Sequence, residues 1–237
     1  MTINILHLYP KEMNLYGDHG NILALTRRLE WRGIKVNVIH YEPGMEIPKD
    51  VDIIFGGGGQ DSGQGKIEKD LKKIAKVLKE KIEAGVPTLL ICGLYQLMGK
   101  YFETAEGQRI EGTGVLDLYT KAGPTRLIGN IVIDSEEFGE VVGYENHSGL
   151  TYLGEDLKPF GEVIIGDGNN DKDSGEGVRY KNCIGTYLHG PILPKNPKVT
   201  DFLIKTALKN KGESIGLKPL DDAIENKAHK VAASRPR

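Results

Sequence analysis

A cysteine stands at the end of a short apolar run, directly before a segment of helical composition. Residues 86–91 are apolar at all but two positions, which is typical of a buried strand in a parallel sheet. Cys92 and Gly93 follow, and a thiol at a sharp strand-to-helix turn has the arrangement of a nucleophile elbow. The free N–H groups and positive dipole end of the helix favour the nucleophilic thiolate. The pattern predicts a reactive cysteine, with an ordinary buried core cysteine as the alternative.

A cysteine nucleophile requires a base that takes its proton and later gives one to the leaving group. Among the six histidines, His189 fits best, because it ends another apolar strand and the next two residues turn the chain away. The carboxyl ends of parallel strands meet at one sheet edge, so Cys92 and His189 are expected side by side. A half-buried strand-end histidine is the alternative reading of His189. His19 and His147, in polar loops flanked by glycine, are the other candidates.

A run of four glycines, Gly56–Gly59, follows a further apolar strand. It lacks the lysine and Ser/Thr of a P-loop, and it lacks the spacing and following helix of a dinucleotide-binding loop. Backbone N–H groups in the run could instead stabilise an oxyanion together with the N–H of Gly93. The run is therefore interpreted as part of an oxyanion site, with a flexible turn as the alternative.

The segments that must position these residues are typical of a doubly wound α/β unit. Strands are predicted at residues 3–9, 35–40, 51–55 and 86–91, with helices at 22–33 and 66–84. Ligands are then expected beyond the carboxyl ends of the strands. Shorter segments at 115–119, 129–133 and 141–145 predict antiparallel strands, followed by one or two strands within 178–188 and a last helix over 199–208. Residues 1–212 are predicted to form one domain, and residues 213–237 a loosely ordered tail.

Composition limits the class of protein. The 237 residues, 39% of them hydrophobic, suffice for one large α/β domain, and a net charge of −2 argues against a nucleic-acid partner. There are two cysteines and no zinc-type spacing, and Cys183 is expected in the core. No run approaches the ~18 apolar residues of a membrane span. The N-terminal residues lack the features of a secretion signal, so a cytoplasmic protein with reduced thiols is expected.

Taken together, these segments resemble a known family. The strand, Cys92 to Gln96 and the following helix are similar to the nucleophile segment of class I, triad-type glutamine amidotransferases. The glycine turn at 56–61 and residues 185–190 extend the match, the latter resembling the subgroup that includes cobyric acid synthase. Residues 14–25, 123–130 and 144–149 narrow it to the glutaminase subunits of bacterial lipid II isoglutaminyl synthases. The resemblance implies a three-layer fold, with a mostly parallel central sheet, helices on both faces and an antiparallel extension in the C-terminal half.

The resemblance also implies a mechanism. The Cys92 thiolate attacks the side-chain amide of L-glutamine, and His189 gives a proton to the leaving ammonia. Water activated by His189 then hydrolyses the γ-glutamyl thioester to glutamate. N–H groups of Gly93 and of Gly57 or Gly58 hold the oxyanion, and one such donor is typically worth about 3 kcal/mol of barrier.

Substrate binding and a partner are implied in the same way. Gln96 and Arg126 match family positions that bind glutamine, and an arginine fork suits its α-carboxylate. No metal or cofactor is implied for this chain. ATP and Mg²⁺ are expected on a separate Mur-ligase-like synthetase subunit in a heterodimer. That subunit would use the ammonia to convert the D-glutamate of lipid II to D-isoglutamine in peptidoglycan synthesis, a process of cell-wall biogenesis and cell shape.

One position departs from the family. Many class I glutaminases carry a glutamate two residues after the histidine, where this chain has Pro191. Either a dyad suffices or a carboxylate comes from elsewhere; the hypothesis is that the partner supplies it, so the isolated chain should be a poor glutaminase.

Three other functions stay open. The chain could be a glutaminase for cobyrinate-type or other amidation, or a non-catalytic Rossmann-like binding module for small molecules in which Cys92 is inert. It could also be a cysteine peptidase or deglycase, although residues 93–100 offer the cysteine neither a histidine nor a glutamate.

Overall fold

The central sheet is six-stranded and mostly parallel. The computed structural model describes residues 1–170, 172–213 and 216–236. The sheet has the order β11-β12-β4-β3-β1-β2, and only the β11–β12 pair is antiparallel. Its strands are β1 (Thr2–Leu8), β2 (Lys35–Tyr41), β3 (Ile53–Gly56), β4 (Thr88–Ile91), β11 (Val178–Tyr180) and β12 (Cys183–Thr186). All residues of β3, β4 and β12 are buried, because helices cover the sheet.

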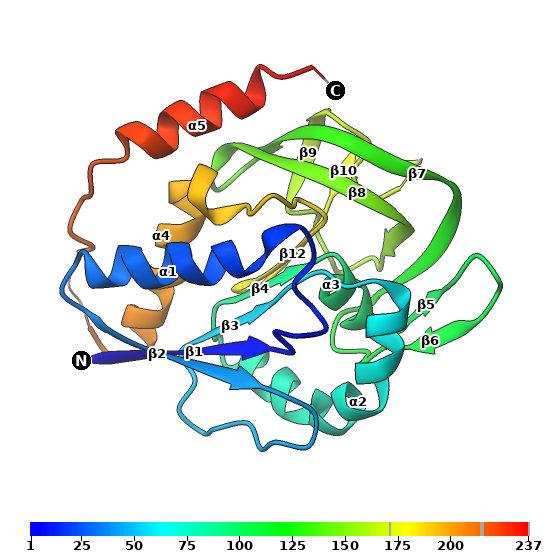
Figure 1. Ribbon diagram of the computed structural model, residues 1–237, viewed down its shortest axis with the longest axis horizontal. Coiled ribbons are helices and arrows are strands. Elements are labelled where there is room, and N and C mark those ends of the chain that lie inside the picture. The colour runs from blue at the N-terminus through cyan, green and yellow to red at the C-terminus, as the bar shows by residue number, and fades with distance from the viewer. Residues whose placement is uncertain (171, 214–215, 237) are drawn as a thin grey trace.

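Helices pack on both faces of this sheet. The helices are α1 (His19–Glu30), α2 (Asp61–Glu83), α3 (Gly93–Leu97), α4 (Pro197–Asn210) and α5 (Ala223–Ala233), with short 3-10 turns η1 (Leu15–Gly17) and η2 (Leu193–Lys195). Helices α1 and α4 contact each other on one face, and α2 covers the other (Figure 1). Right-handed crossovers require this, because β1–α1–β2 and β3–α2–β4 run in opposite directions across the sheet.

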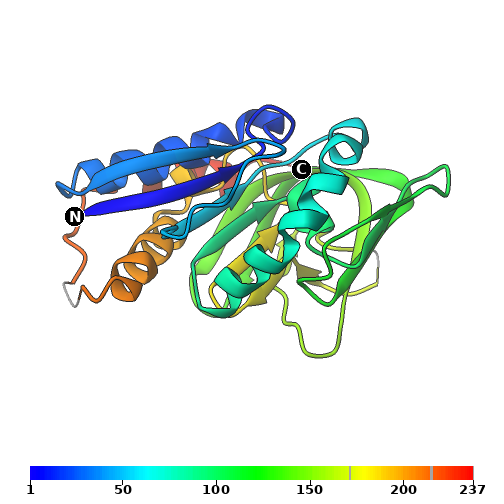
Figure 2. The same ribbon diagram turned by 90° about the horizontal axis from the view of Figure 1, so that it is seen from below.

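A second sheet extends the C-terminal half. It contains β5 (Tyr101–Glu103), β6 (Arg109–Glu111), β7 (Leu118–Ser135), β8 (Gly139–Leu153), β9 (Gly161–Ile165) and β10 (Gly175–Glu176), all paired antiparallel except β5 with β7. The long β7–β8 ribbon forms one end of the molecule, opposite the edge strand β2 and its neighbour β1 (Figure 1, Figure 2). The predicted α/β fold with a mostly parallel sheet and an antiparallel extension is confirmed.

One helix and one group of strands differ in extent from the sequence prediction. Helix α2 begins five residues before residue 66, where the glycines at 63 and 65 had weakened the helical signal. The three predicted short strands are two long ones, and β7 continues through residues 123–126 with only a shift of register against β8. None of the described helices is long and apolar enough to cross a lipid bilayer.

The C-terminal segment contains helix α5 where a loosely ordered tail was predicted. Arg28 of α1 pairs with Asp222 just before the helix, and Arg32 donates to the carbonyl of Lys218 at 2.8 Å. The sequence showed only weak periodicity there because no residue of α5 is buried. The division of the chain at residue 212 stays a prediction.

Candidate active site

Cys92 lies between β4 and α3 in a strained backbone conformation. Its φ of 47° and ψ of −103° fall in a region that side chains rarely adopt and that costs of order 1–3 kcal/mol. Its N–H donates to the carbonyl of Thr186 at 2.8 Å, which ties the elbow to the end of β12. The residue is 6% exposed, at the first turn of α3. The strand-to-helix turn predicted for the thiol is therefore present.

His189 follows β12, the parallel neighbour of β4, so the two strand ends lie together. Backbone hydrogen bonds to Tyr144 of β8, of 2.9 and 3.2 Å, hold it in place. A Cβ added at Gly58 would lie 2.7 Å from Cε1 of His189 and 3.3 Å from Cβ of Cys92. The structure thus brings Cys92, His189 and the glycine turn to one point, and only a glycine fits between them.

Asp18 is the carboxylate nearest to the histidine in this arrangement. Its Oδ1 lies 3.6 Å from Nδ1 of His189, and both side chains are fully buried. Burial alone would lower the pKa of His189, but Cys92 and Asp18 outweigh it and raise the pKa from 6.5 to about 10. Asp18 stands at the N-cap position of α1, but its side chain makes no cap hydrogen bond there. The contacts of Asp18 are with Gly58 and His189, which are distant from it in the sequence.

The amide of Gly58 is already engaged. It donates to Oδ2 of Asp18 at 2.6 Å, so it faces the carboxylate rather than a bound substrate. The loop that carries Asp18 is itself fixed to the glycine turn, because Leu15 donates to the carbonyl of Gly58 at 3.0 Å. Nearer the elbow, the nitrogen of Gly59 lies 3.0 Å from the position of a Cβ added at Gly93. Gly57 is packed against the carbonyl of Met13, which a Cβ would approach to 2.3 Å.

A pocket of about 390 Å³ opens above the cysteine. It is lined by Leu15, Tyr16, Gly59, Gln60, Ser62, Gln64, Cys92, Gln96, Phe102, Arg126, Asn146, His147, Ser148 and Gly149. Gln96 is buried, accepts from Gln64 at 2.9 Å and donates to the hydroxyl of Tyr187 at 3.1 Å. Arg126 reaches across from β7 and donates to both the side chain and the carbonyl of Asn146. Both predicted substrate-binding residues therefore line the same pocket as Cys92.

His147, another candidate base from the sequence, lines the pocket and braces the β7–β8 ribbon. Its ring stacks on Tyr187 with centroids 3.6 Å apart, and Nδ1 lies 2.7 Å from the carbonyl of Gly149. Burial lowers the pKa of His147 to about 3. A neutral ring with its proton on Nδ1 follows, since a carbonyl can only accept. His19 of α1 lies instead against His7.

Glu176 is a further buried carboxyl group behind the site, and the sequence did not reveal it. It lies in β10 of the second sheet and accepts hydrogen bonds from the hydroxyl of Thr186 and the N–H of Tyr187, at 2.9 and 2.7 Å. Burial raises its pKa from 4.5 to about 8. Glu176 thereby fixes the stretch of chain between β12 and His189.

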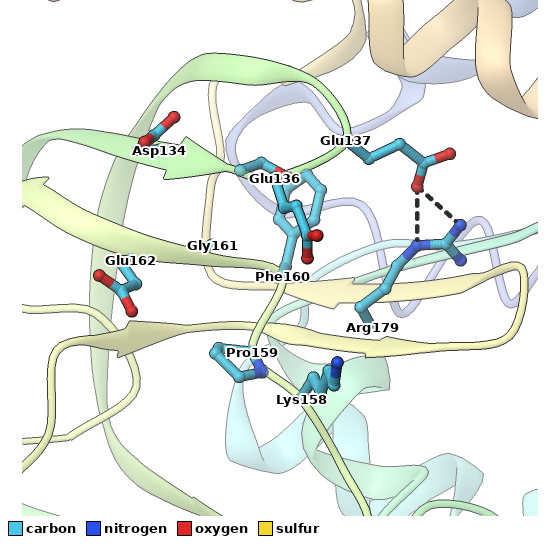
Figure 3. A pocket seen from close by; sticks show the side chains of 10 residues that line it. Asp134, Glu136, Glu137, Lys158, Pro159, Phe160, Gly161, Glu162 and Arg179 are labelled. Carbon is cyan, nitrogen blue, oxygen red and sulfur yellow. Dashed lines mark hydrogen bonds and ion pairs between the residues drawn. The ribbon is translucent and has the colours of Figure 1, made fainter.

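A larger cavity, of about 710 Å³, lies away from the predicted site residues. Figure 3 shows its charged walls, in which Arg179 is already paired with Glu137. Its lining contains neither a cysteine nor a histidine, so Cys92 stays the candidate nucleophile. Cys183 is fully buried and burial raises its pKa to about 12, as expected of a core cysteine. Within the described part of the chain, no three His, Cys, Asp or Glu side chains are grouped to hold a metal ion.

Comparison with known proteins gives matches over most of the chain. A family model described as the CobB/CobQ-like glutamine amidotransferase domain matches residues 4–197. The chain is 47% identical to the lipid II isoglutaminyl synthase (glutamine-hydrolyzing) subunit GatD of Staphylococcus aureus (strain N315), over 98% of this chain and 96% of that protein. It is 43% identical to the subunit of the same name from Streptococcus pneumoniae (strain ATCC BAA-255 / R6), over 94% and 87% of the two chains.

A solved structure of low sequence identity shares the fold. PurLQS from Thermotoga maritima superimposes with a TM-score of 0.61 at 14% identity, over 86% of this chain and 99% of the matched chain. At that identity the match concerns the architecture alone.

Proposed function

This chain belongs to the CobB/CobQ-like glutamine amidotransferase family, as its sequence motifs had indicated, and we propose that it is the glutaminase subunit of a lipid II isoglutaminyl synthase. The observation that carries the proposal is the meeting of Cys92, His189 and Gly58, with Cys92 lining the same pocket as Gln96 and Arg126. Near full-length similarity to two GatD subunits supports the choice of product.

In the proposed reaction, glutamine enters with its side-chain amide toward Cys92. The thiolate adds to the amide carbon, and the oxygen becomes an oxyanion facing the free N–H of Gly93 at the start of α3. The amide of Gly59 is a better second donor than that of Gly58, which is bonded to Asp18; Gly57 stays a candidate from the sequence. His189 as imidazolium gives its proton to the leaving nitrogen, so the C–N bond breaks and ammonia departs.

The second half of the reaction regenerates the enzyme. The now neutral His189 takes a proton from water, and the resulting hydroxide attacks the thioester carbon. The C–S bond breaks, glutamate leaves and the thiolate is restored. Asp18 stabilises the imidazolium in both halves, which offers, within this chain, an alternative to a carboxylate from the partner.

Gln96 and Arg126 are proposed to hold the substrate. Arg126 can present its guanidinium to the α-carboxylate of glutamine while Asn146 holds its other edge. Gln96 is fixed between Gln64 and Tyr187, so its amide is already oriented when glutamine arrives.

Ammonia is mostly protonated in neutral water and ammonium is no nucleophile, so the product must be used close to where it forms. We propose a Mur-ligase-like synthetase as the partner, which binds ATP and Mg²⁺ and activates the α-carboxyl of D-glutamate in lipid II. No cofactor is assigned to this chain, and the reaction is placed in the cytoplasm, where ATP is supplied.

The test measures ammonia released from L-glutamine, and lipid II amidation, with and without the co-expressed synthetase. Wild type is expected to support amidation from glutamine, and Cys92→Ser only from added ammonium salt. Glutamine-dependent amidation by Cys92→Ser would refute the proposal. Amidation of a cobyrinate-type acceptor in place of lipid II would favour the alternative product.

A further inference from the structure

Helix α5 is an exposed element at the edge of the molecule (Figure 1), next to η2 and the β7–β8 ribbon. None of its 11 residues is buried, and Ile224 is 81% exposed. Val231, two turns later on the same helix, is 45% exposed. Helices shorter than ~12–15 residues are marginal in water without packing partners. We therefore expect another polypeptide to pack on the exposed apolar side chains of this short helix.

A groove runs between α5 and the rest of the protein, with a volume of about 600 Å³. It is lined by Asn130, Gly143, Tyr144, Gly190, Lys195, Ile224, Lys227, Ala228, Val231, Ala232 and Arg235. All three charged residues among these, Lys195, Lys227 and Arg235, are cations, although the chain as a whole carries −2. The alanines at 228 and 232 leave room for a chain to approach the helix backbone. The groove therefore suits an occupant with carboxylates and apolar side chains.

The groove ends at the catalytic histidine. Tyr144, in its wall, exchanges backbone hydrogen bonds with His189, and Gly190 is the next residue along the chain. Lys195 spans this end, donating to the carbonyl of Gly190 at 2.8 Å. An occupant would thus contact the residues that hold His189, beside the site where ammonia forms.

We propose that this groove, between α5 and the β7–β8 ribbon, is the docking surface for the synthetase partner, and that the partner fills it with an acidic segment bearing apolar side chains. The inference rests on the proposed function for the identity of the partner. The basic lining supplies the charge complementarity, and the nearness to His189 distinguishes a subunit that must receive ammonia from other occupants.

Binding of the synthetase to the full-length chain is the test, measured by titration at low and moderate salt. The double variant Lys227→Glu/Arg235→Glu should bind at least about tenfold more weakly, because like charges then face the carboxylates. The matched control is Lys230→Glu, the same exchange on the same helix but outside the groove lining. It should bind within about twofold of wild type, and added salt should weaken wild-type binding. Equal affinity of the double variant and wild type would overturn the docking surface.

Two further measurements separate the possible failures. If the wild-type chain neither binds the synthetase nor supports lipid II amidation, the proposed function itself fails. If it does both while the double variant binds equally well, only the docking inference fails. A wild-type homodimer that the double variant abolishes would show a second copy of this chain in the groove, and would overturn the assignment of the partner. Because Lys227 and Arg235 are both exposed, the charge changes should leave the thermal unfolding of the chain unaltered.

Discussion

Oδ1 of Asp18 lies 3.6 Å from Nδ1 of His189, and both side chains are fully shielded from water. One comes from the loop before α1 and the other from the chain after β12. At low dielectric the attraction of Asp18 for the imidazole adds to that of Cys92, and the two together raise the pKa of His189 and favour the charged imidazole. We propose that Asp18 takes the role of the carboxylate that the family pattern carries where this chain has Pro191.

Replacing Asp18 by asparagine should impair ammonia release. The amide carries no charge, so the pKa of His189 should fall from about 10 toward its ordinary value of 6.5. We expect kcat to fall by about 10²-fold or more, by analogy with other triads that lose their carboxylate. The measurement is kcat against pH, with and without the synthetase. Asp52→Asn is the control, because Asp52 lies just before β3, at the opposite end of that strand from the site, and pairs with Lys211. An unchanged profile would return the role to a carboxylate from the partner.

Labelling should single out Cys92. A chloroketone that mimics glutamine is expected to modify Cys92 in the wild type and in Cys183→Ala, because Cys183 is fully buried and its pKa is about 12. Cys92→Ala should take up no label. Intact-protein mass and peptide mapping give the result, and a wild-type protein that resists the reagent would favour the non-catalytic binding module.

Arg126→Ala should weaken glutamine binding. Loss of a hydrogen bond to a charged group costs about 1.5–3 kcal/mol, which corresponds to a rise in KM of roughly 10- to 100-fold, with kcat little changed. Arg109→Ala removes a similarly exposed arginine that lies over Tyr101 and is the matched control. Initial rates over a range of glutamine concentrations decide the matter; a fall confined to kcat would contradict a role in substrate binding.

Glu176→Gln should change how stability depends on pH. Between pH 4.5 and about 8 the unfolded chain releases this proton while the folded chain keeps it, so the wild type loses stability as pH rises through that window. Glutamine does not titrate. Within this pH window, the free energy of unfolding of the variant should rise relative to that of the wild type by about 1.4 kcal/mol per pH unit.

Urea unfolding at several pH values measures this difference. Glu162→Gln, at an exposed site on β9, serves as the control and should follow the wild type. If the free energy of unfolding depends on pH in the same way for Glu176→Gln and the wild type, Glu176 ionises normally in the folded protein.

Local patterns predicted the parts of the fold and site that depend on neighbours in sequence. The apolar run before Cys92 and the strand before His189 were enough to place both at one sheet edge, because parallel strands align their carboxyl ends. The partners of Asp18 and Glu176 could not be predicted from local patterns. They lie at least 40 residues from Asp18 and at least 10 residues from Glu176 in the sequence. Helix α5 was missed for a different reason: without a buried face it has no strong periodic signal.

The close fit around Gly58 bears on how related sequences are read. A single methyl group there would press against both the imidazole and the base of the thiol side chain. A related protein could keep the cysteine and the histidine and fold normally, yet be inactive because an alanine or serine at this position separates the two side chains. We therefore expect the residue at position 58 to matter for activity as much as the proposed nucleophile and base.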